Sequence, residues 1–486
     1  MEELDIATIK KRSIQGILAL TSRNFIIQIM NFSANFVLTV ILNPSVFGIF
    51  FVVSAINSFL SYFSDIGLAS ALIQKKESLT DDDLKTTFTI QQILVITAVL
   101  IAFLASGWVG EFYKLEKDGI QLFQALVIAF FLSSLKTIPS VMLERSLKFN
   151  KLIIPQIVEA IVFNIVVLTL AIKGFEIRSF TYAVLARGVF GLIAMYIIAP
   201  WKIKIGFARN SASKLLSFGI PFQLNSFLAL LKDDLLIIFL GKILPLVQVG
   251  YIGFAQKWAF YPLRFIMDTI IRITFPSYSR LQHEKVLLGL AIEKSLFAIS
   301  FFIFPALAGL AILAPYFIKF FPIPKYHQWE PALLSLTFFA IHAALSSVST
   351  PLTNALNAIG KIKITLSLMV FWTIATWILT PLFIVLFGFN GVSLASMVIT
   401  FSVVLVVYIT KKYIDFNIIK TIKNQIISAS FMGLLMYFLS PFVVINFPLL
   451  IVMILIGSVA YLGMMLVLAK SQILADMVLI KENLKK

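Results

Sequence analysis

The chain has 486 residues, of which 60% are hydrophobic and only 13% are charged. Soluble domains typically carry about 25% charged residues, so this composition is that of an integral membrane protein. The net charge of +17 does not indicate a nucleic-acid partner, because the basic residues lie in short connections between apolar segments. The absence of cysteine excludes disulfides, thiolate metal sites and cysteine nucleophiles.

Fourteen apolar segments are long enough to cross a bilayer as helices, which takes about 20 residues. They follow a polar stretch, residues 1–13, that lacks the pattern of a secretory signal and is expected to remain on the mature protein. The sequence therefore predicts an all-α integral membrane protein with 14 transmembrane helices. The predicted spans are residues 16–42, 45–72, 84–107, 120–142, 150–172, 178–199, 214–240, 248–272, 287–313, 331–354, 363–386, 391–410, 423–444 and 448–469.

Lysine and arginine are distributed unevenly between the two sides of the predicted membrane. If the N-terminus is inside, the inner segments hold 27 of these residues and the outer loops hold 7. Positively charged loops stay in the cytoplasm during insertion. Both termini are therefore predicted to be cytoplasmic, which requires an even number of spans.

Short internal similarities divide the chain into two halves. Residues 46–50 resemble 248–252, residues 174–179 resemble 388–393, and Pro139 matches Pro351. Three matches in order at nearly one offset predict two six-helix lobes of the same orientation around a central cavity, as in transporters. We assign residues 1–199 to an N-terminal lobe, 200–213 to a cytoplasmic linker, 214–410 to a C-terminal lobe, and 411–486 to two additional helices and a cytoplasmic tail.

Charged residues inside the predicted spans are common in the first eight and nearly absent from the last six. A charge inside the bilayer costs about 3 kcal/mol or more, so it persists mainly beside a partner or a water-filled path. The first eight spans are therefore where function is expected. The charged residues within them include Arg23, Asp65, Lys136, Glu159, Arg187, Lys232, Asp233, Asp234, Lys257, Arg264 and Asp268.

Polar side chains recur at helical spacing on one face of four predicted spans. They predict a hydrated cavity between the lobes. The alternative is that hydroxyls and amides join neighbouring helices, as they do in membrane bundles. For spans two and ten this alternative is as well supported as the cavity, whereas for spans one and eight the cavity is favoured. The sets are Asn24, Gln28, Asn31 and Asn35; Ser54, Ser58, Ser61 and Asp65, with Asn57 adjacent; Lys257, Tyr261, Arg264 and Asp268; and His342, Ser346, Ser349 and Thr353.

The depth of each charge distinguishes structural pairs from ligand contacts. Arg23 and Asp65 lie at similar depth in adjacent spans, as do Lys136 and Glu159, so each pair can neutralise itself. The cluster of Lys232, Asp233, Asp234 and Lys257 lies near the outer ends of spans seven and eight and is predicted to form an outer gate.

Two arginines lie nearer the middle of the membrane, one in each half. Arg187 and Arg264 suit a phosphate or diphosphate, which guanidinium groups bind through forked, charge-assisted hydrogen bonds. The alternative, that both simply pair with acidic side chains, stays open. Several acidic residues are able to bind a coupling ion, but nothing in their spacing selects one.

The sequence does not favour enzyme chemistry, and it predicts no metal and no cofactor. The three histidines are far apart, and the acidic run at residues 81–83 is explained by capping at a helix N-terminus. A phosphate-binding P-loop is absent. A membrane glycosyltransferase or polymerase would need a larger outer loop with a pair of catalytic carboxylates.

Short motifs over roughly the first 360 residues occur in a recognisable order. They include Leu42-Asn43-Pro44 followed by residues 47–50, then residues 65–68, 144–149, 275–279 and 358–361. Together they resemble bacterial polysaccharide exporters, the Wzx-like O-antigen flippases of the multidrug/oligosaccharidyl-lipid/polysaccharide superfamily. The resemblance implies that the chain flips undecaprenyl-diphosphate-linked oligosaccharide units across the inner membrane by alternating access, for lipopolysaccharide or other surface polysaccharide.

This function assigns roles to the polar residues of the spans. The implied partners are the lipid-linked oligosaccharide, membrane lipids, a coupling ion such as H+ or Na+, and a polysaccharide polymerase or glycosyltransferases. Two related functions stay open: a multidrug/cation antiporter using Asp65 or Asp268, and a flippase for the peptidoglycan precursor. The predicted contacts are Arg187, Arg264, Arg23 and Lys257 for diphosphate; Asn24, Gln28, Asn31, Asn35 and Asn57 for sugar; and Asp65, Lys232, Asp233, Asp234 and Asp268 for gating or ion coupling.

Overall fold

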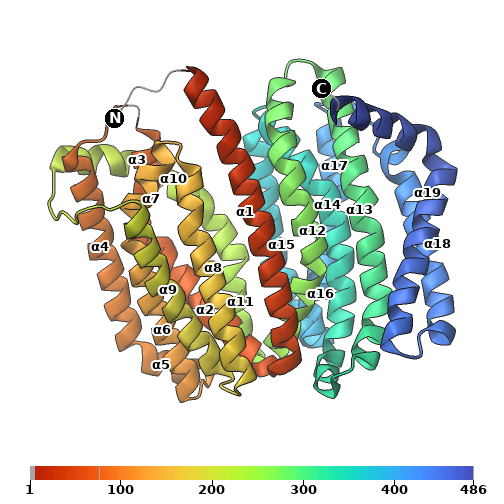
Figure 1. Cartoon of the computed structure of the whole chain (residues 1–486), viewed down its shortest axis with the longest axis horizontal. Coiled ribbons are helices and arrows are strands. Elements are labelled where there is room, and N and C mark those ends of the chain that lie inside the picture. Colours follow the sequence, from red (N-terminus) through yellow and green to blue (C-terminus); the bar gives the residue numbers. More distant parts are fainter. Residues whose placement is uncertain (1–5, 76, 485–486) are drawn as a thin grey trace. The chain divides into compact units, whose positions relative to one another are not determined.

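The computed structural model describes residues 6–75 and 77–484. Within them the fold is helical and contains no β-strand, which confirms the all-α class. The chain forms two compact units, Met1–Gly250 and Tyr251–Lys486. The predicted lobes, divided by a linker at residues 200–213, stay a prediction. Figure 1 shows the helices in order along the chain.

The helices follow one another with short connections. The first unit contains α1 (Ile6–Ile41), α2 (Pro44–Asp65), α3 (Leu68–Gln74), α4 (Asp81–Leu104), α5 (Ser106–Tyr113), α6 (Lys117–Ser134), α7 (Thr137–Arg145), α8 (Phe149–Ile172), α9 (Ile177–Ile198), α10 (Arg209–Lys232) and α11 (Asp234–Ile243). Helix α12 (Leu246–Arg280) begins in the first unit and continues into the second. The second unit adds α13 (Lys285–Phe320), the 3-10 helix η1 (Pro324–Ala332), α14 (Leu333–Ala358), α15 (Ile362–Phe387), α16 (Asn390–Thr400), α17 (Val403–Lys411), α18 (Ile418–Val443) and α19 (Phe447–Leu484).

Each of the fourteen predicted spans falls on one helix or on two consecutive helices. Among the described residues, eleven helices are long and apolar enough to cross a membrane, or twelve if the bent pair α6–α7 is one span. The protein is therefore a multi-pass membrane protein. The two predicted spans outside this set lie on α10–α11 and α12. The count of fourteen and the cytoplasmic termini stay predictions.

Two predicted continuous spans are broken for identifiable reasons. Helix α2 ends at Asp65 because Ile66 and Gly67 adopt left-handed conformations, with φ of 47° and 75°. Helices α6 and α7 meet at 44° because Pro139 cannot donate to the carbonyl of Leu135, four residues earlier. That carbonyl instead accepts a hydrogen bond from the Tyr196 hydroxyl at 3.1 Å.

The acidic run at residues 81–83 caps α4, as expected. Asp83 is buried and accepts hydrogen bonds from the backbone N–H of Thr80 at 2.9 Å and from Lys75 at 2.6 Å. The Thr80 hydroxyl accepts in return from the Asp83 backbone N–H, which completes a capping box. The carboxylates also lie at the positive end of the helix dipole. Local helix chemistry therefore accounts for this cluster.

The internal similarity around Gly48 and Gly250 has a structural counterpart within the first unit. A Cβ built on Gly48 would lie 1.8 Å from the carbonyl oxygen of Leu246, and one on Gly250 would lie 2.0 Å from that of Pro44. Each glycine thus meets the residue four positions before its counterpart. The two internally similar segments therefore contact each other, while the two-lobe repeat stays a prediction.

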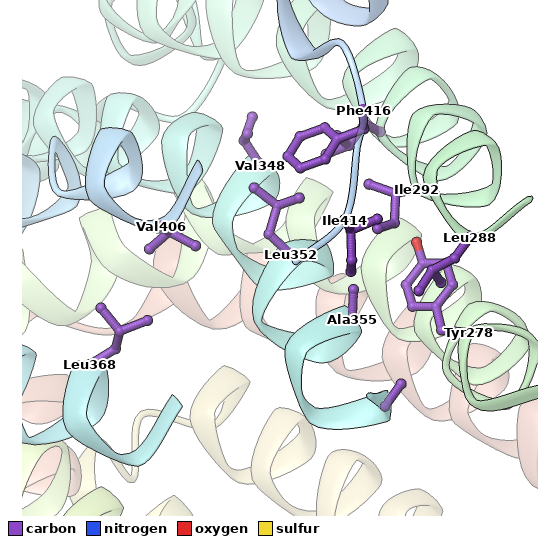
Figure 2. Close-up of a cluster of buried hydrophobic side chains, with 12 residues drawn as sticks. Tyr278, Leu288, Ile292, Val348, Leu352, Ala355, Leu368, Val406, Ile414 and Phe416 are labelled. Atoms are coloured by element: carbon purple, nitrogen blue, oxygen red, sulfur yellow. The ribbon is translucent and has the colours of Figure 1, made fainter. Parts of the chain in front are cut away.

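The core of the second unit connects α12 to its neighbours. Tyr278 of α12 packs against Leu288 and Ile292 of α13, with Leu352 of α14 and Phe416 in the same cluster (Figure 2). Most of these side chains are at most 1% exposed, and Phe416 is 3% exposed. This cluster fixes the C-terminal end of α12, the helix that carries Lys257 and Arg264.

Candidate functional site

The polar face of α1 lies along α8 in the first unit. Arg23 donates to the Asn24 side-chain oxygen at 2.9 Å and to the side-chain oxygen of Gln156 on α8. Asn164 of α8 donates to the Asn31 side-chain oxygen at 3.0 Å. Part of this face therefore joins two helices, as polar groups in membrane bundles do.

The other members of the predicted sugar-binding set lie on α1 and α2. The Asn35 side chain donates to the backbone carbonyl of Asn31 at 2.9 Å, and Gln28 is half-buried on the same helix. On α2 the side-chain oxygens of Asn57 and Ser54 are buried without a hydrogen-bond partner among the described residues. Buried polar atoms are nearly always paired, so these two oxygens are candidates for contact with water or a ligand.

A cluster of three charged side chains joins α6–α7, α8 and α9. Lys136, at the break between α6 and α7, forms an ion pair with Glu159 of α8, as predicted from their similar depth. Arg187 of α9 approaches the other oxygen of the same carboxylate, with its Nε 3.6 Å away. We call Lys136, Glu159 and Arg187 the charged triad. It carries two positive charges and one negative charge.

The two cations of the charged triad differ in exposure. The Lys136 and Glu159 side chains are 11% and 14% exposed, whereas the Arg187 side chain is 55% exposed. Lys136 makes the closer contact and satisfies most of the need of the carboxylate for a counter-ion. Arg187 is held by a longer contact through its Nε, and more than half of its side chain is exposed. The arrangement suits a cation that is positioned by one anion and able to bind a second.

Gly191 of α9 makes room for the charged triad. A Cβ at this position would lie 2.3 Å from Oε1 of Glu159, too close for the carboxylate to stay beside Lys136. We expect Gly191→Ala to lower the free energy of unfolding by about 1–3 kcal/mol, the usual cost of overpacking an interior. Thermal unfolding in detergent measures this as a lower melting temperature.

Gly463→Ala on α19 is the matched control for Gly191→Ala. No atom lies within 4 Å of a Cβ built on Gly463, so its melting temperature should stay within about 1 °C of the unmodified protein or rise slightly, since alanine favours helix. A Gly191→Ala protein that melts at the same temperature as this control would contradict the packing around Glu159.

The predicted gating cluster lies at the junction of α10 and α11. Lys232 ends α10, Asp233 is exposed between the helices, and Asp234 begins α11. The sequence predicted one continuous span here, whereas the helix breaks at Asp233. On α12, Lys257 is half-buried and Arg264 is exposed, close enough for their charges to interact. The side chains of Asp65 and Asp268 lie outside the described residues.

The polar face of α14 is largely satisfied inside the second unit. His342 Nδ1 contacts the carbonyl oxygen of Ser396 at 3.0 Å and the hydroxyl of Thr400, both on α16. The hydroxyls of Ser349 and Thr353 donate to carbonyls of their own helix. These contacts favour a structural role for the polar face of α14 over a place in a cavity.

Sequence reasoning missed two polar residues of α8. Gln156 bonds Arg23 and Asn164 bonds Asn31, yet neither was among the predicted site residues. The signal was present, because an amide inside an apolar span is costly unless it has a partner. What the sequence did not show was which neighbouring helix provides that partner.

A family model described as polysaccharide biosynthesis protein matches residues 37–331. The chain belongs to this family. The match begins within α1 and ends in η1, so it includes the charged triad, the helix break at Asp233 and α12. The resemblance to Wzx-like polysaccharide exporters is thereby confirmed.

Two relatives cover most of the chain. An uncharacterized membrane protein in the cps region of Klebsiella pneumoniae is 24% identical over 369 residues, which is 74% of this chain and 73% of that protein. The lipopolysaccharide biosynthesis protein WzxC of Escherichia coli strain K12 is 25% identical over 346 residues, 69% of this chain and 68% of its own length.

Solved structures share the fold. The lipid II flippase MurJ in an inward closed conformation superposes with a TM-score of 0.77 and 14% identity, covering 93% of this chain and 99% of MurJ. A multidrug resistance MATE family transporter of the MOP superfamily, in an inward-facing conformation, gives a TM-score of 0.62 at 15% identity, covering 82% of this chain and 98% of the transporter. The fold is thus that of the MurJ and MATE proteins.

Proposed function

We propose that this protein flips an undecaprenyl-diphosphate-linked oligosaccharide from the inner to the outer leaflet of the bacterial inner membrane, in the synthesis of a surface polysaccharide. The observation that carries the proposal is the family match over residues 37–331 in a chain with the fold of a lipid flippase. The relation to WzxC supports a polysaccharide as the product. Movement by alternating access is part of the proposal.

Within the first unit, the diphosphate is proposed to bind Arg187, with Arg23 as a further contact; the roles of Lys257 and Arg264 stay predictions from the sequence. Arg187 has a side chain that is about half exposed and held by Glu159, and a guanidinium matches two phosphate oxygens at once. Arg23 already donates to Gln156 and Asn24, so binding there would have to replace or share these bonds. Arg187 is therefore the contact that the geometry supports best.

The sugars are proposed to meet the polar groups of α1 and α2. Asn57 supports this best, because its buried side-chain oxygen has no donor among the described residues and a sugar hydroxyl is able to supply one. Asn24, Gln28, Asn31 and Asn35 remain proposed contacts along α1. Gating or coupling to H+ or Na+ is assigned as a proposal to the junction at Lys232, Asp233 and Asp234, together with Asp65 and Asp268.

The proposal is tested by flipping in proteoliposomes of the purified protein. An undecaprenyl-diphosphate oligosaccharide is placed in both leaflets, and the fraction open to an added sugar-oxidising or sugar-cleaving reagent is followed with time. We expect that fraction to rise from about one half towards completion in a protein-dependent way. No difference from empty liposomes would contradict the proposal.

A multidrug antiporter is the second candidate, favoured by the MATE fold at a TM-score of 0.62. An antiporter would move a cationic dye against an imposed H+ or Na+ gradient, whereas the proposed flippase would not. The same proteoliposomes, loaded with a fluorescent cation in place of the lipid-linked sugar, separate the two. Lipid II as the flipped substrate distinguishes a peptidoglycan-precursor flippase in the same assay.

A further inference from the structure

Two glycine contacts join α2 and α3 to α10 and the start of α12, all within the first unit. At the beginning of α2, Gly48 and Gly250 lie so close that a Cβ on either would meet a backbone carbonyl at 1.8 or 2.0 Å. Real Cβ atoms do not approach backbone this closely, so a larger residue at either position forces the helices apart. Backbone therefore packs directly on backbone at this contact, as small residues allow in membrane helices.

The second contact joins the start of α3 to α10. A Cβ on Gly67 would lie 2.2 Å from the carbonyl oxygen of Gly219, and a Cβ on Gly219 would lie 2.6 Å from that of Ile66. One helical turn away, Tyr62 and Gln223 make reciprocal bonds. The Tyr62 hydroxyl donates to the Gln223 backbone carbonyl, and the Gln223 side chain donates to the Tyr62 carbonyl at 2.9 Å.

The two contacts are separated by about the thickness of a membrane. Nineteen residues of mostly helical chain lie from Gly48 to Gly67, which corresponds to about 28 Å at about 1.5 Å per residue, against about 30 Å for the hydrocarbon core. By the predicted orientation, Gly48–Gly250 is the outer contact and Gly67–Gly219 the inner one. The unpartnered oxygens of Ser54 and Asn57 lie on α2 between them.

We propose that these contacts are the outer and inner gates of the path that α2 lines. The outer gate opens when α2 parts from the start of α12, residues 246–250, and the inner gate opens when α3 parts from α10. Backbone surfaces of this kind separate without changes of side-chain rotamer, and the Tyr62–Gln223 bonds add a latch to the inner gate only. The inference rests on the proposed transport function, and it names the residues at which the two open states differ.

The test adds one methyl group to each gate. Gly250→Ala prevents close packing at the outer contact, and Gly219→Ala does so at the inner contact. Because the chain has no cysteine, Ser54→Cys serves as a nearly isosteric reporter between the gates. Its alkylation by a membrane-impermeant thiol reagent is measured from the outside in spheroplasts and from the inside in inverted vesicles.

We expect opposite responses from the two variants. Gly250→Ala should raise the outside labelling rate at least about fivefold, and Gly219→Ala should raise the inside rate similarly, because one methyl group in a packed contact costs about 1–3 kcal/mol. Gly463→Ala, which meets no atom, should change neither rate. Labelling that rises from the same side in both variants, or from neither side, would overturn the gate assignment.

Two further measurements keep this outcome interpretable. Monodisperse elution in detergent establishes that each variant is folded. Tyr62→Phe removes the hydrogen bond from the Tyr62 hydroxyl to the Gln223 carbonyl and adds no volume. It should raise only the rate of labelling from the inside. An unchanged inside rate in both Gly219→Ala and Tyr62→Phe would refute the inner gate. Labelling needs no substrate, so a failed flipping assay with intact gate responses would count against the proposed lipid and not against the gates.

Discussion

Replacing Arg187 with alanine is expected to slow flipping of an undecaprenyl-diphosphate oligosaccharide by about 10- to 100-fold, since a hydrogen bond to a charged group contributes about 1.5–3 kcal/mol. The Arg187 side chain is 55% exposed and its Nε is held by Glu159, so it is positioned before the substrate arrives. Initial rates in proteoliposomes with equal amounts of protein measure the effect. Arg187→Lys keeps the charge but loses the forked geometry. Its flipping rate should lie between that of the unmodified protein and that of Arg187→Ala.

Arg178 provides the matched control on the same helix. It lies at the start of α9 and donates to Asp118 at 2.9 Å, with half of its side chain exposed. Arg178→Ala removes the same chemical group from α9 outside the charged triad and should leave the flipping rate within about twofold, because exposed ion pairs contribute about 0–1 kcal/mol. Equal rates for Arg187→Ala and Arg178→Ala would remove Arg187 from the proposed diphosphate site.

Replacing Lys136 with methionine is expected to lower the free energy of unfolding by about 3 kcal/mol, near the lower end of the range for breaking one side of a buried ion pair. The Glu159 carboxylate, 14% exposed, would keep only the longer contact with Arg187. Methionine fills a similar volume, so the loss reports the charge rather than a cavity. Denaturation in mixed micelles, followed by circular dichroism, measures it.

A second substitution separates the charge from other effects. In Lys136→Met/Glu159→Gln no carboxylate is left unpaired, so more than half of the lost stability should return. Lys85→Met is the control, because its partner Asp82 is 55% exposed and the expected loss is below about 1 kcal/mol. A Lys136→Met protein as stable as Lys85→Met would show that the ion pair with Glu159 does not support the fold.

The sequence predicted the helices well and their interruptions less well. Each long apolar run falls on one helix or two consecutive helices, and the order of short motifs identified the family. The breaks at Gly67, Lys136 and Asp233 lie inside apolar segments that are long enough to be read as single spans. Pro139 was visible in the sequence, but prolines also occur inside continuous helices here, such as Pro155 in α8.

The sequence also predicted one charged contact and missed the neighbours of others. Lys136 and Glu159 were paired from their depth alone, and the structure brings them together. That Arg187 shares the same carboxylate was an open alternative, and the bonds from Gln156 to Arg23 and from Asn164 to Asn31 were not foreseen. Depth along a helix follows from counting residues, whereas these contacts depend on which face each helix turns to its neighbour.

The sequence by itself determined that this is a helical membrane protein, because a bilayer accepts only spans of fixed apolar length whose backbone bonds are satisfied internally. Its short motifs carried the resemblance to polysaccharide exporters. Only the tertiary structure decided which helix faces meet, as in the contact of Arg187 with Glu159 and the contacts Gly48–Gly250 and Gly67–Gly219. Lipid is as apolar as leucine, so hydropathy does not set the rotation of one helix against the next. That rotation is set by close packing of small residues and by a few hydrogen bonds, which form only when the chain is folded.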